Sequence, residues 1–526
     1  MPPADLTRRE FLALSGSALA GAWLAQACAH FAPRSPFSLG VASGDPAPDG
    51  FVLWTRLAPD PLSTDPAAPG GLAGGDVPLA YEIATDDGMR DVVLRGAATA
   101  EAAFAHSVHV EVAGLEPARP YWYRFTSGAA ESPIGRARTA PAPGAKLERL
   151  RFACASCANY EHGWFSAYRH LAADDPDLVI FLGDYIYEYV EKRRPTVRAH
   201  SDGVDATTLP LYRNRYAQYR LDPDLSALHQ SVTAIATWDD HEVQNDYADR
   251  WSQTFDDPQE FLKRRAAAYQ AFYEHMPLRP SRARPNGPAM RVYERFAFGD
   301  LVEVSLLDGR QYRSREACWA KPDHGGGHLE TDATCPERRD PRRTYLGAAQ
   351  EKWLLDGLVR SRARWKLLAQ DVLMAQLREK MPDGQVGFWT DDWNGYPANR
   401  SHLLQTLHEH RVRNAVVLSG DIHSFWANDL KLDFDAPRSP TVASELVGTS
   451  ITSYPPPYEK FAAFLPDNPH VRFFDSRVRG YMVSELEPQR LTTRFRAISD
   501  PQDRDAKLTT LATFAIEDGK PGPVPA

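Results

Sequence analysis

Four apolar segments of this chain each end in side chains that can bind metal ions. They are FACASCAN, FLGDYIY, ATWDDHE and VLSGDIH, at residues 152–159, 181–187, 236–242 and 417–423. Open α/β sheets place their ligands at the carboxyl ends of strands, so we expect these four ends to meet at one site. A lone Asp-Asp-His is usually a turn or a cap, but four coincident strand ends favour a polynuclear metal site.

The segments around these ends predict a mostly parallel sheet. LRFACAS and DLVIFLGD have the composition of buried strands, and HGWFSAYRHLAADD between them repeats its apolar residues at helical spacing. A further helix is predicted to begin at Asp257-Pro258, an N-cap followed by a first-turn proline. The predicted fold class of residues 148–510 is therefore α/β, and residues 516–526 are expected to form a loose tail.

Residues 36–140 have a different pattern, with short strands and turns and no convincing helix. In VHVEVAGLEPARPYWYRF, the placing of Tyr121 and Tyr123 resembles the tyrosine corner of immunoglobulin-like sandwiches. The pattern predicts a small all-β, immunoglobulin-like domain before the α/β domain.

Length and charge limit the classes of function. A chain of 526 residues suits two or three domains. Its formal net charge is −9, and no segment builds a basic face, which argues against nucleic acid as a partner. An anionic substrate would have to be held by local arginines or metal ions against the overall negative field.

The first residues predict export. Arg8-Arg9 precede a short apolar run rich in alanine and glycine, which is typical of a Tat signal and too short for a stable membrane span. We interpret residues 1–29 as this signal, with cleavage near Ala27, the Tat machinery as partner, and a periplasmic or secreted product. Cys28 stands where a lipid-anchored cysteine would, although the residues before it fit a lipobox poorly.

Four further cysteines divide into two pairs. Cys154 and Cys157 form a CxxC without a second CxxC, which is not a zinc ribbon. Cys318 and Cys335 flank a glycine-rich loop, which they would close in an oxidising compartment. The sequence alone leaves open whether this disulfide forms.

The order of these motifs resembles that of calcineurin-type metallophosphatases, in particular PhoD-like alkaline phosphatases. Gly183-Asp184 matches the family's Gly-Asp pair, whose aspartate bridges two metals, and Tyr187 matches the tyrosine that binds ferric iron. Asp240 stands where many relatives have the asparagine of a GNHE motif, and His241 matches the histidine that follows it.

The rest of the chain extends the resemblance. Asp421 and His423 resemble the late His-x-His of the family, with aspartate in the first position, and Cys157 stands where other metallophosphatases have Asp-x-His. LGVASGDP and LWTRL resemble the N-terminal domain of the family. The resemblance implies a metallophosphatase-type β-sandwich core flanked by helices, preceded by the small all-β domain.

The predicted metal ligands are Cys157, Asp184, Tyr187, Asp240, Asp421 and His423. Thiolate and tyrosinate favour Fe³⁺, which prefers strongly donating anionic ligands. The oxygens of Asp240 and Asp421 suit a harder cation, and the resemblance implies Ca²⁺ there. Tyr185 and Tyr189 are interpreted as packing residues.

The resemblance implies an exported alkaline phosphatase, active in phosphate acquisition, that hydrolyses phosphate esters through a metal-activated water or hydroxide. His241 is expected to steady the transition-state oxygens or to protonate the leaving alkoxide. Arg310, in LLDGRQYRS, is expected to clamp phosphate with its guanidinium. The segment resembles a family stretch Asp-Thr-Arg-Gln-Tyr, with Gly309 in place of threonine.

Three alternatives remain. A phosphodiesterase or a phospholipase D-like enzyme would use the same ions. A secreted binding protein with purely structural metals, or a cysteine hydrolase using Cys157 and His423, would not account for Tyr187 and Asp240 together. The physiological substrate, the preference for monoesters or diesters, the metal identity and number, and the oligomeric state are left open.

Overall fold

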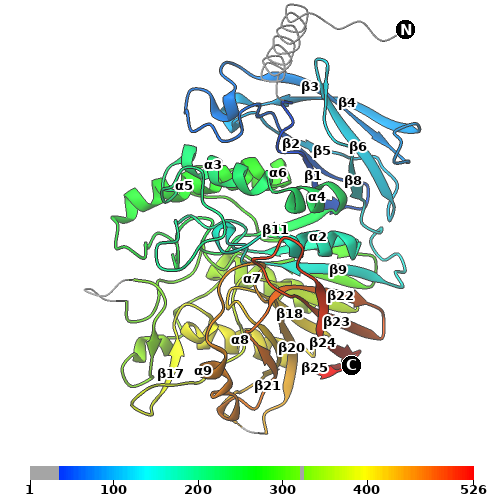
Figure 1. Ribbon diagram of the computed structural model, residues 1–526. Coiled ribbons are helices and arrows are strands. Elements are labelled where there is room, and N and C mark those ends of the chain that lie inside the picture. The colour runs from blue at the N-terminus through cyan, green and yellow to red at the C-terminus, as the bar shows by residue number, and fades with distance from the viewer. Residues whose placement is uncertain (1–34, 320–324, 437) are drawn as a thin grey trace, which may run out of the picture.

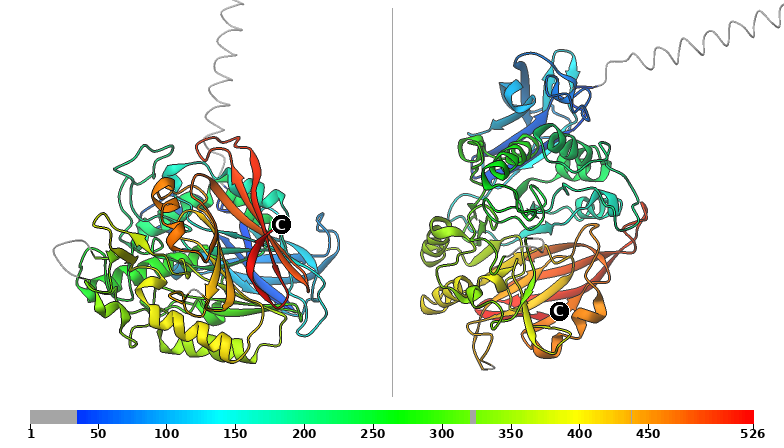
Figure 2. Two further views of the ribbon diagram at one scale, coloured as in Figure 1. Left: turned by 90° about the horizontal axis from the view of Figure 1, so that it is seen from below. Right: turned by 90° about the vertical axis from the view of Figure 1, so that its left-hand side faces the viewer.

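A computed structural model describes residues 35–319, 325–436 and 438–526 of the protein. The predicted Tat signal, residues 1–29, lies outside these ranges. The described chain places an all-β N-terminal part at one end of the molecule and the C-terminal strands at the other (Figures 1 and 2). No helix within the described ranges has both the length and the apolar composition needed to cross a bilayer.

Two large sheets form the centre of the α/β part. The first has ten strands, in the spatial order β25 (Lys520–Pro525), β24 (Leu508–Glu517), β23 (Arg490–Ile498), β22 (Arg479–Leu486), β9 (Leu150–Ala155), β10 (Leu178–Leu182), β11 (Ala234–Thr237), β1 (Val41–Ala47), β2 (Gly50–Arg56) and β5 (Ser107–Glu111). The second has the order β12 (Glu294–Phe298), β13 (Val302–Leu306), β15 (Trp365–Ala369), β18 (Ala415–Ser419), β20 (Thr441–Val447), β19 (Phe425–Lys431) and β21 (Val471–Asp475). Strands β9, β10 and β11 are parallel to one another, as are β13, β15, β18 and β20.

The central strands are buried on both faces, which explains their nearly continuous apolar sequences. Phe152, Ile180 and Val416 belong to a core between the two sheets. The outer face of the first sheet packs against α2 (Ser166–Ala173), α3 (Leu209–Arg220), α4 (Pro223–Ser231), α5 (Pro258–His275) and α6 (Pro280–Ala283). The outer face of the second packs against α7 (Gly347–Arg360), α8 (Pro397–Glu409) and α9 (Tyr458–Ala462). The predicted fold class, a β-sandwich flanked by helices, is confirmed.

The predicted start of α5 is also confirmed. The Asp257 side chain accepts hydrogen bonds from the backbone N–H groups of Gln259 and Glu260, and Pro258 occupies the first turn. A small sheet of β14 (Leu329–Glu330), β17 (Val386–Trp389) and β16 (Glu379–Lys380) lies in the long connections around α7. Cys318 and Cys335 form a disulfide in the same region.

The N-terminal part is a sandwich of β1, β2 and β5 against a second sheet. The strands of that sheet are β4 (Val92–Ala100), β3 (Val77–Ala84), β6 (Pro120–Ser127), β7 (Ala130–Glu131) and β8 (Gly135–Arg138). Tyr121 forms the expected corner, because its Oη accepts a hydrogen bond from the N–H of Glu116 at 2.9 Å. Strand β1 pairs in parallel with β11 through Gly44 and Ala234. The two domains therefore share one continuous sheet.

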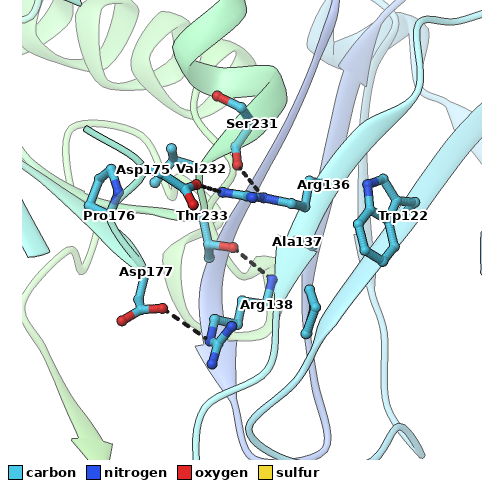
Figure 3. A pocket seen from close by; sticks show the side chains of 11 residues that line it. Trp122, Arg136, Ala137, Arg138, Asp175, Pro176, Asp177, Ser231, Val232 and Thr233 are labelled. Atoms are coloured by element: carbon cyan, nitrogen blue, oxygen red, sulfur yellow. Dashed lines mark hydrogen bonds and ion pairs between the residues drawn. The ribbon is translucent and has the colours of Figure 1, made fainter. Parts of the chain in front are cut away.

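Charged side chains join the domains around a cavity of about 160 Å³ (Figure 3). Arg136 donates to the carbonyl oxygen of Ser231 at 2.8 Å and pairs with Asp175, and Arg138 lies 3.5 Å from Asp177. Because both guanidinium groups already have partners on the α/β domain, we interpret this cavity as a structural joint.

The predicted loose tail, residues 516–526, is wrong. These residues end β24 and form β25, in a hairpin that pairs Ala515 with Val524. The reason is local: Asp518-Gly519 makes a two-residue turn, in which Gly519 has a φ of 72°. Gly522 also donates to Ser444 of β20 at 2.8 Å, so the hairpin is held against the second sheet.

Candidate metal centre

The four predicted strand ends meet, although they belong to two sheets. The ends of β9, β10 and β11 come from the first sheet, and the end of β18 comes from the second. Side chains there form three groups of possible metal ligands, and within each group the ligand atoms lie within 4.8 Å of one another. The groups are Cys157, Asp184 and His423; Asp184, Asp240 and His241; and Asp184, Asp239 and Asp421. Asp184 belongs to every group, which is the position a bridging carboxylate requires.

Tyr187 completes the first group. Its Oη lies 2.7 Å from Asp184 Oδ2 and 3.1 Å from His423 Nε2. The other ring nitrogen of His423, Nδ1, lies 2.8 Å from the carbonyl oxygen of Tyr454, which orients the ring and leaves Nε2 facing the site. By contrast, Tyr185 points away from these ligands, and its Oη lies 2.9 Å from Nε2 of buried His229. The interpretation of Tyr185 as a packing residue agrees with this position.

The backbone at these residues is strained. Four non-glycine residues of the site have left-handed φ angles between 52° and 62°: Cys157, Asp184, Asp421 and His423. Each such conformation costs roughly 1–3 kcal/mol and persists only where the surrounding structure enforces it. Gly183 has a specific task here, because a Cβ on it would lie 2.5 Å from the Cβ of Asp239. Glycine therefore lets the loops after β10 and β11 approach closely.

Glu242 joins these two loops. Its carboxylate accepts hydrogen bonds from the backbone N–H groups of Asp184 at 3.2 Å, Asp239 at 2.8 Å and Tyr185 at 2.6 Å. Burial raises the pKa of Glu242 to about 7. Sequence reasoning missed both Glu242 and Asp239, although both stand in the ATWDDHE segment.

His241 is paired with Glu188, another residue that sequence reasoning missed. The Nδ1 atom of His241 lies 2.7 Å from Glu188 Oε2, and Glu188 Oε1 accepts a hydrogen bond from the N–H of Asn245 at 2.8 Å. Burial acts to lower the pKa of His241, but the negative charges of Asp240, Glu188 and Asp184 outweigh it and raise the pKa well above its usual value. The contact with Glu188 fixes the orientation of the ring.

Arg310 lies beside the site but is not open to a substrate. It is fully buried, its Nε lies 2.5 Å from Asp239 Oδ1, and its Nη1 and Nη2 lie 2.9 and 3.0 Å from the two oxygens of Asp391. Both edges of the guanidinium are thus occupied by carboxylates. In this structure Arg310 holds Asp239 in place, and its role as a phosphate clamp stays a prediction.

The donor set fits metal cations. Asp184 Oδ1 and Asp239 Oδ2 are buried and accept no hydrogen bond from any described residue. Burial and neighbouring carboxylates raise the pKa values of Asp184 and Asp239, and that of Asp421 to about 7. Buried carboxylates crowded in this way need positive charge to ionise. Burial, then Asp184, also raises the thiol pKa of Cys157, which argues against a free cysteine nucleophile.

Comparison with known proteins agrees with this geometry. A family model described as PhoD-like phosphatase matches residues 152–495, and the model of its N-terminal domain matches residues 23–141. The chain belongs to the PhoD-like phosphatase family. The resemblance drawn from the motifs is thereby confirmed.

Two relatives extend the match over nearly the whole chain. Alkaline phosphatase D of Bacillus subtilis (strain 168) is 42% identical over 509 residues, which cover 95% of this chain and 84% of that protein. A solved structure described as "Structure of PhoD" superimposes with a TM-score of 0.87 at 42% identity, covering 94% of this chain and 92% of that chain. All the strand-end residues described above lie within the family match at residues 152–495.

Proposed function

We propose that this PhoD-like phosphatase is an exported alkaline phosphatase that hydrolyses phosphate esters with bound Fe³⁺ and Ca²⁺. The observation that carries the proposal is the position of Asp184, which belongs to all three groups of potential ligands where the four strand ends meet. The identity of 42% to an alkaline phosphatase supports the reaction class, phosphoric ester hydrolysis.

Two sets of residues would hold the cations. Cys157, Tyr187, His423 and Asp184 would hold Fe³⁺, because thiolate and phenolate are strong anionic donors. Asp184, Asp239, Asp240 and Asp421 offer the carboxylate oxygens that Ca²⁺ prefers. Asp421 and His423 are partly exposed, whereas the other members are buried, so substrate would approach from their side.

The chain's own residues would manage the proton. Bound cations would supply positive charge for the phosphate oxygens and acidify the attacking water. His241, held through Nδ1 by Glu188, has an Nε2 that bonds to no described residue. It is therefore placed to donate a proton to the leaving oxygen. Glu188 keeps the ring oriented.

The proposal is tested with a generic phosphomonoester and metal analysis of the purified protein. A calcium chelator should abolish hydrolysis and added Ca²⁺ should restore it. Asp421→Asn should lower both activity and calcium content. Asp340→Asn, a change at an aspartate that pairs with exposed Arg342, should alter neither. Full activity after exhaustive chelation would contradict the calcium assignment. The same assay on a phosphodiester measures the preference between ester classes.

Export forms a separate part of the proposal. The twin arginines Arg8-Arg9 before a short apolar run support recognition by the Tat machinery and a periplasmic or secreted product. Replacing both with lysine should leave unprocessed protein in the cytoplasm. Normal appearance of mature protein outside the cytoplasm would refute the Tat assignment. Labelling with a radioactive fatty acid tests lipid anchoring at Cys28.

A further inference from the structure

A fifth strand end, that of β20, lies against the residues that are proposed to hold Fe³⁺. The loop of residues 448–454 follows β20, and its backbone N–H at Ser453 lies 3.3 Å from the carbonyl oxygen of Cys157. Its Tyr454 carbonyl contacts His423 Nδ1 at 2.8 Å. The loop therefore contacts two of the residues assigned to Fe³⁺, and it contributes no charged ligand of its own.

The Ser453 hydroxyl contacts another of these residues, Tyr187. Its Oγ lies 2.7 Å from Tyr187 Oη and 2.9 Å from the carbonyl oxygen of Cys157. That carbonyl also faces the backbone N–H groups of Thr452 and Ser453, at 3.4 and 3.3 Å, so it has other donors. The single hydroxyl proton of Ser453 is thus available to Tyr187.

The other polar contacts of Tyr187 Oη have a different character. Asp184 Oδ2 and His423 Nε2 are both atoms that would bind an ion themselves. Ser453 is the contact whose role is limited to donating a hydrogen bond. Hydrogen bonds to a metal-binding oxygen fix its direction and lower its electron donation.

Arg479 supports Ser453 from behind. Its Nη1 donates to the carbonyl oxygen of Ser453 at 2.7 Å and to Ser450 Oγ at 3.0 Å, while its Nη2 donates to the carbonyl oxygen of Ser476 at 2.6 Å. Arg479 is 4% exposed, and no carboxylate of a described residue lies within 4 Å of it. A buried cation without a carboxylate partner is costly, and burial lowers its pKa to about 9. Asp475 is a further negative charge near Arg479, but its carboxylate already pairs with Arg477.

We propose that Ser453 is a positioning residue for the metal centre, whose hydroxyl donates to Tyr187 Oη while Arg479 fixes the Ser453 peptide. The inference rests on the proposed function, because it requires Tyr187 to bind iron as phenolate. It assigns a role to two buried residues outside the set of ligands: Ser453, which follows β20 of the second sheet, and Arg479, which begins β22 of the first.

The visible absorption band of the iron-loaded protein tests the inference. Ser453→Ala should move the phenolate-to-iron band to longer wavelength and make the iron reduction potential more negative, because the phenolate loses a donor and becomes a stronger electron donor. Ser453→Thr keeps the hydroxyl and should restore the wild-type band. Thr452→Val is the matched control, since Thr452 Oγ1 donates to the carbonyl oxygen of Asn159 at 2.6 Å and not to Tyr187. It should leave the band unchanged.

The outcomes separate the two proposals. A coloured wild-type protein whose band is unchanged in Ser453→Ala refutes the role of Ser453 and leaves the iron assignment standing. A colourless wild-type protein with stoichiometric iron refutes phenolate ligation and this inference with it. If Ser453→Ala does not fold, the wild-type phenolate vibrations are compared in H₂O and D₂O by resonance Raman. An exchangeable donor on Tyr187 Oη predicts an isotope shift, and its absence overturns the proposal.

Discussion

Replacing Arg310 with methionine should destabilise the metal-free protein by about 4 kcal/mol. Arg310 is fully buried and makes three charge-assisted hydrogen bonds, one to Asp239 and two to Asp391. Each is worth about 1.5–3 kcal/mol, but they share one group, and breaking a buried ion pair costs about 3–5 kcal/mol in all. Arg313 still pairs with Asp391 in the variant, whereas Asp239 loses its partner, which favours the middle of that range.

The assay is chemical denaturation of chelated protein, followed by metal analysis and kinetics of the reloaded enzyme. Arg310→Met should unfold at lower denaturant and retain less of the divalent cation, because Asp239 is no longer held. Exposed Arg342, changed in the same way, is the control and should behave as wild type. If Arg310→Met instead unfolds as wild type does, keeps its metals and only raises KM for a phosphomonoester, Arg310 is a phosphate clamp and the positioning argument is wrong.

Three further perturbations give expected outcomes. Tyr187→Phe should bleach the visible band and lower the iron content. Tyr185→Phe, which loses the contact of its hydroxyl with buried His229, should keep both. An unchanged band in Tyr187→Phe would contradict phenolate ligation. Cys318→Ser with Cys335→Ser should lower unfolding free energy by about 3 kcal/mol, because the bridge closes a loop of 17 residues; identical denaturation of the oxidised and doubly substituted proteins would argue against this. Burial lowers the pKa of His470 to about 4, so between pH 6.5 and 4 the unfolded chain binds a proton at this histidine that the folded protein does not. The free energy of unfolding should therefore fall by up to about 3 kcal/mol as the pH drops from 6.5 to 4, and this loss is absent above pH 6.5. His470→Gln should flatten that part of a pH–stability profile, and an unaltered slope would exclude His470 as its source.

The sequence determined the features that depend on neighbouring residues. An apolar run followed by Gly183-Asp184 specifies a buried strand and a tight turn, and Asp257 specifies the start of a helix, because hydrogen bonds and sterics within a few positions decide both. The ligand types and the family followed from the same local motifs. The prediction of a loose tail is wrong although the signal for a hairpin is local, since Asp518-Gly519 specifies a two-residue turn.

Only the tertiary structure decided which of these groups face one another. Asp239 and Asp240 are adjacent in sequence, yet the first pairs with Arg310 while the second accepts the backbone N–H of Asp246. Tyr187 and Ser453 meet across 266 positions, because their strands belong to two sheets packed face to face. Local sequence fixes the direction of a side chain relative to its own strand. The packing of one sheet on the other fixes which oxygen it meets, and that packing is set by apolar contacts between residues far apart in the chain.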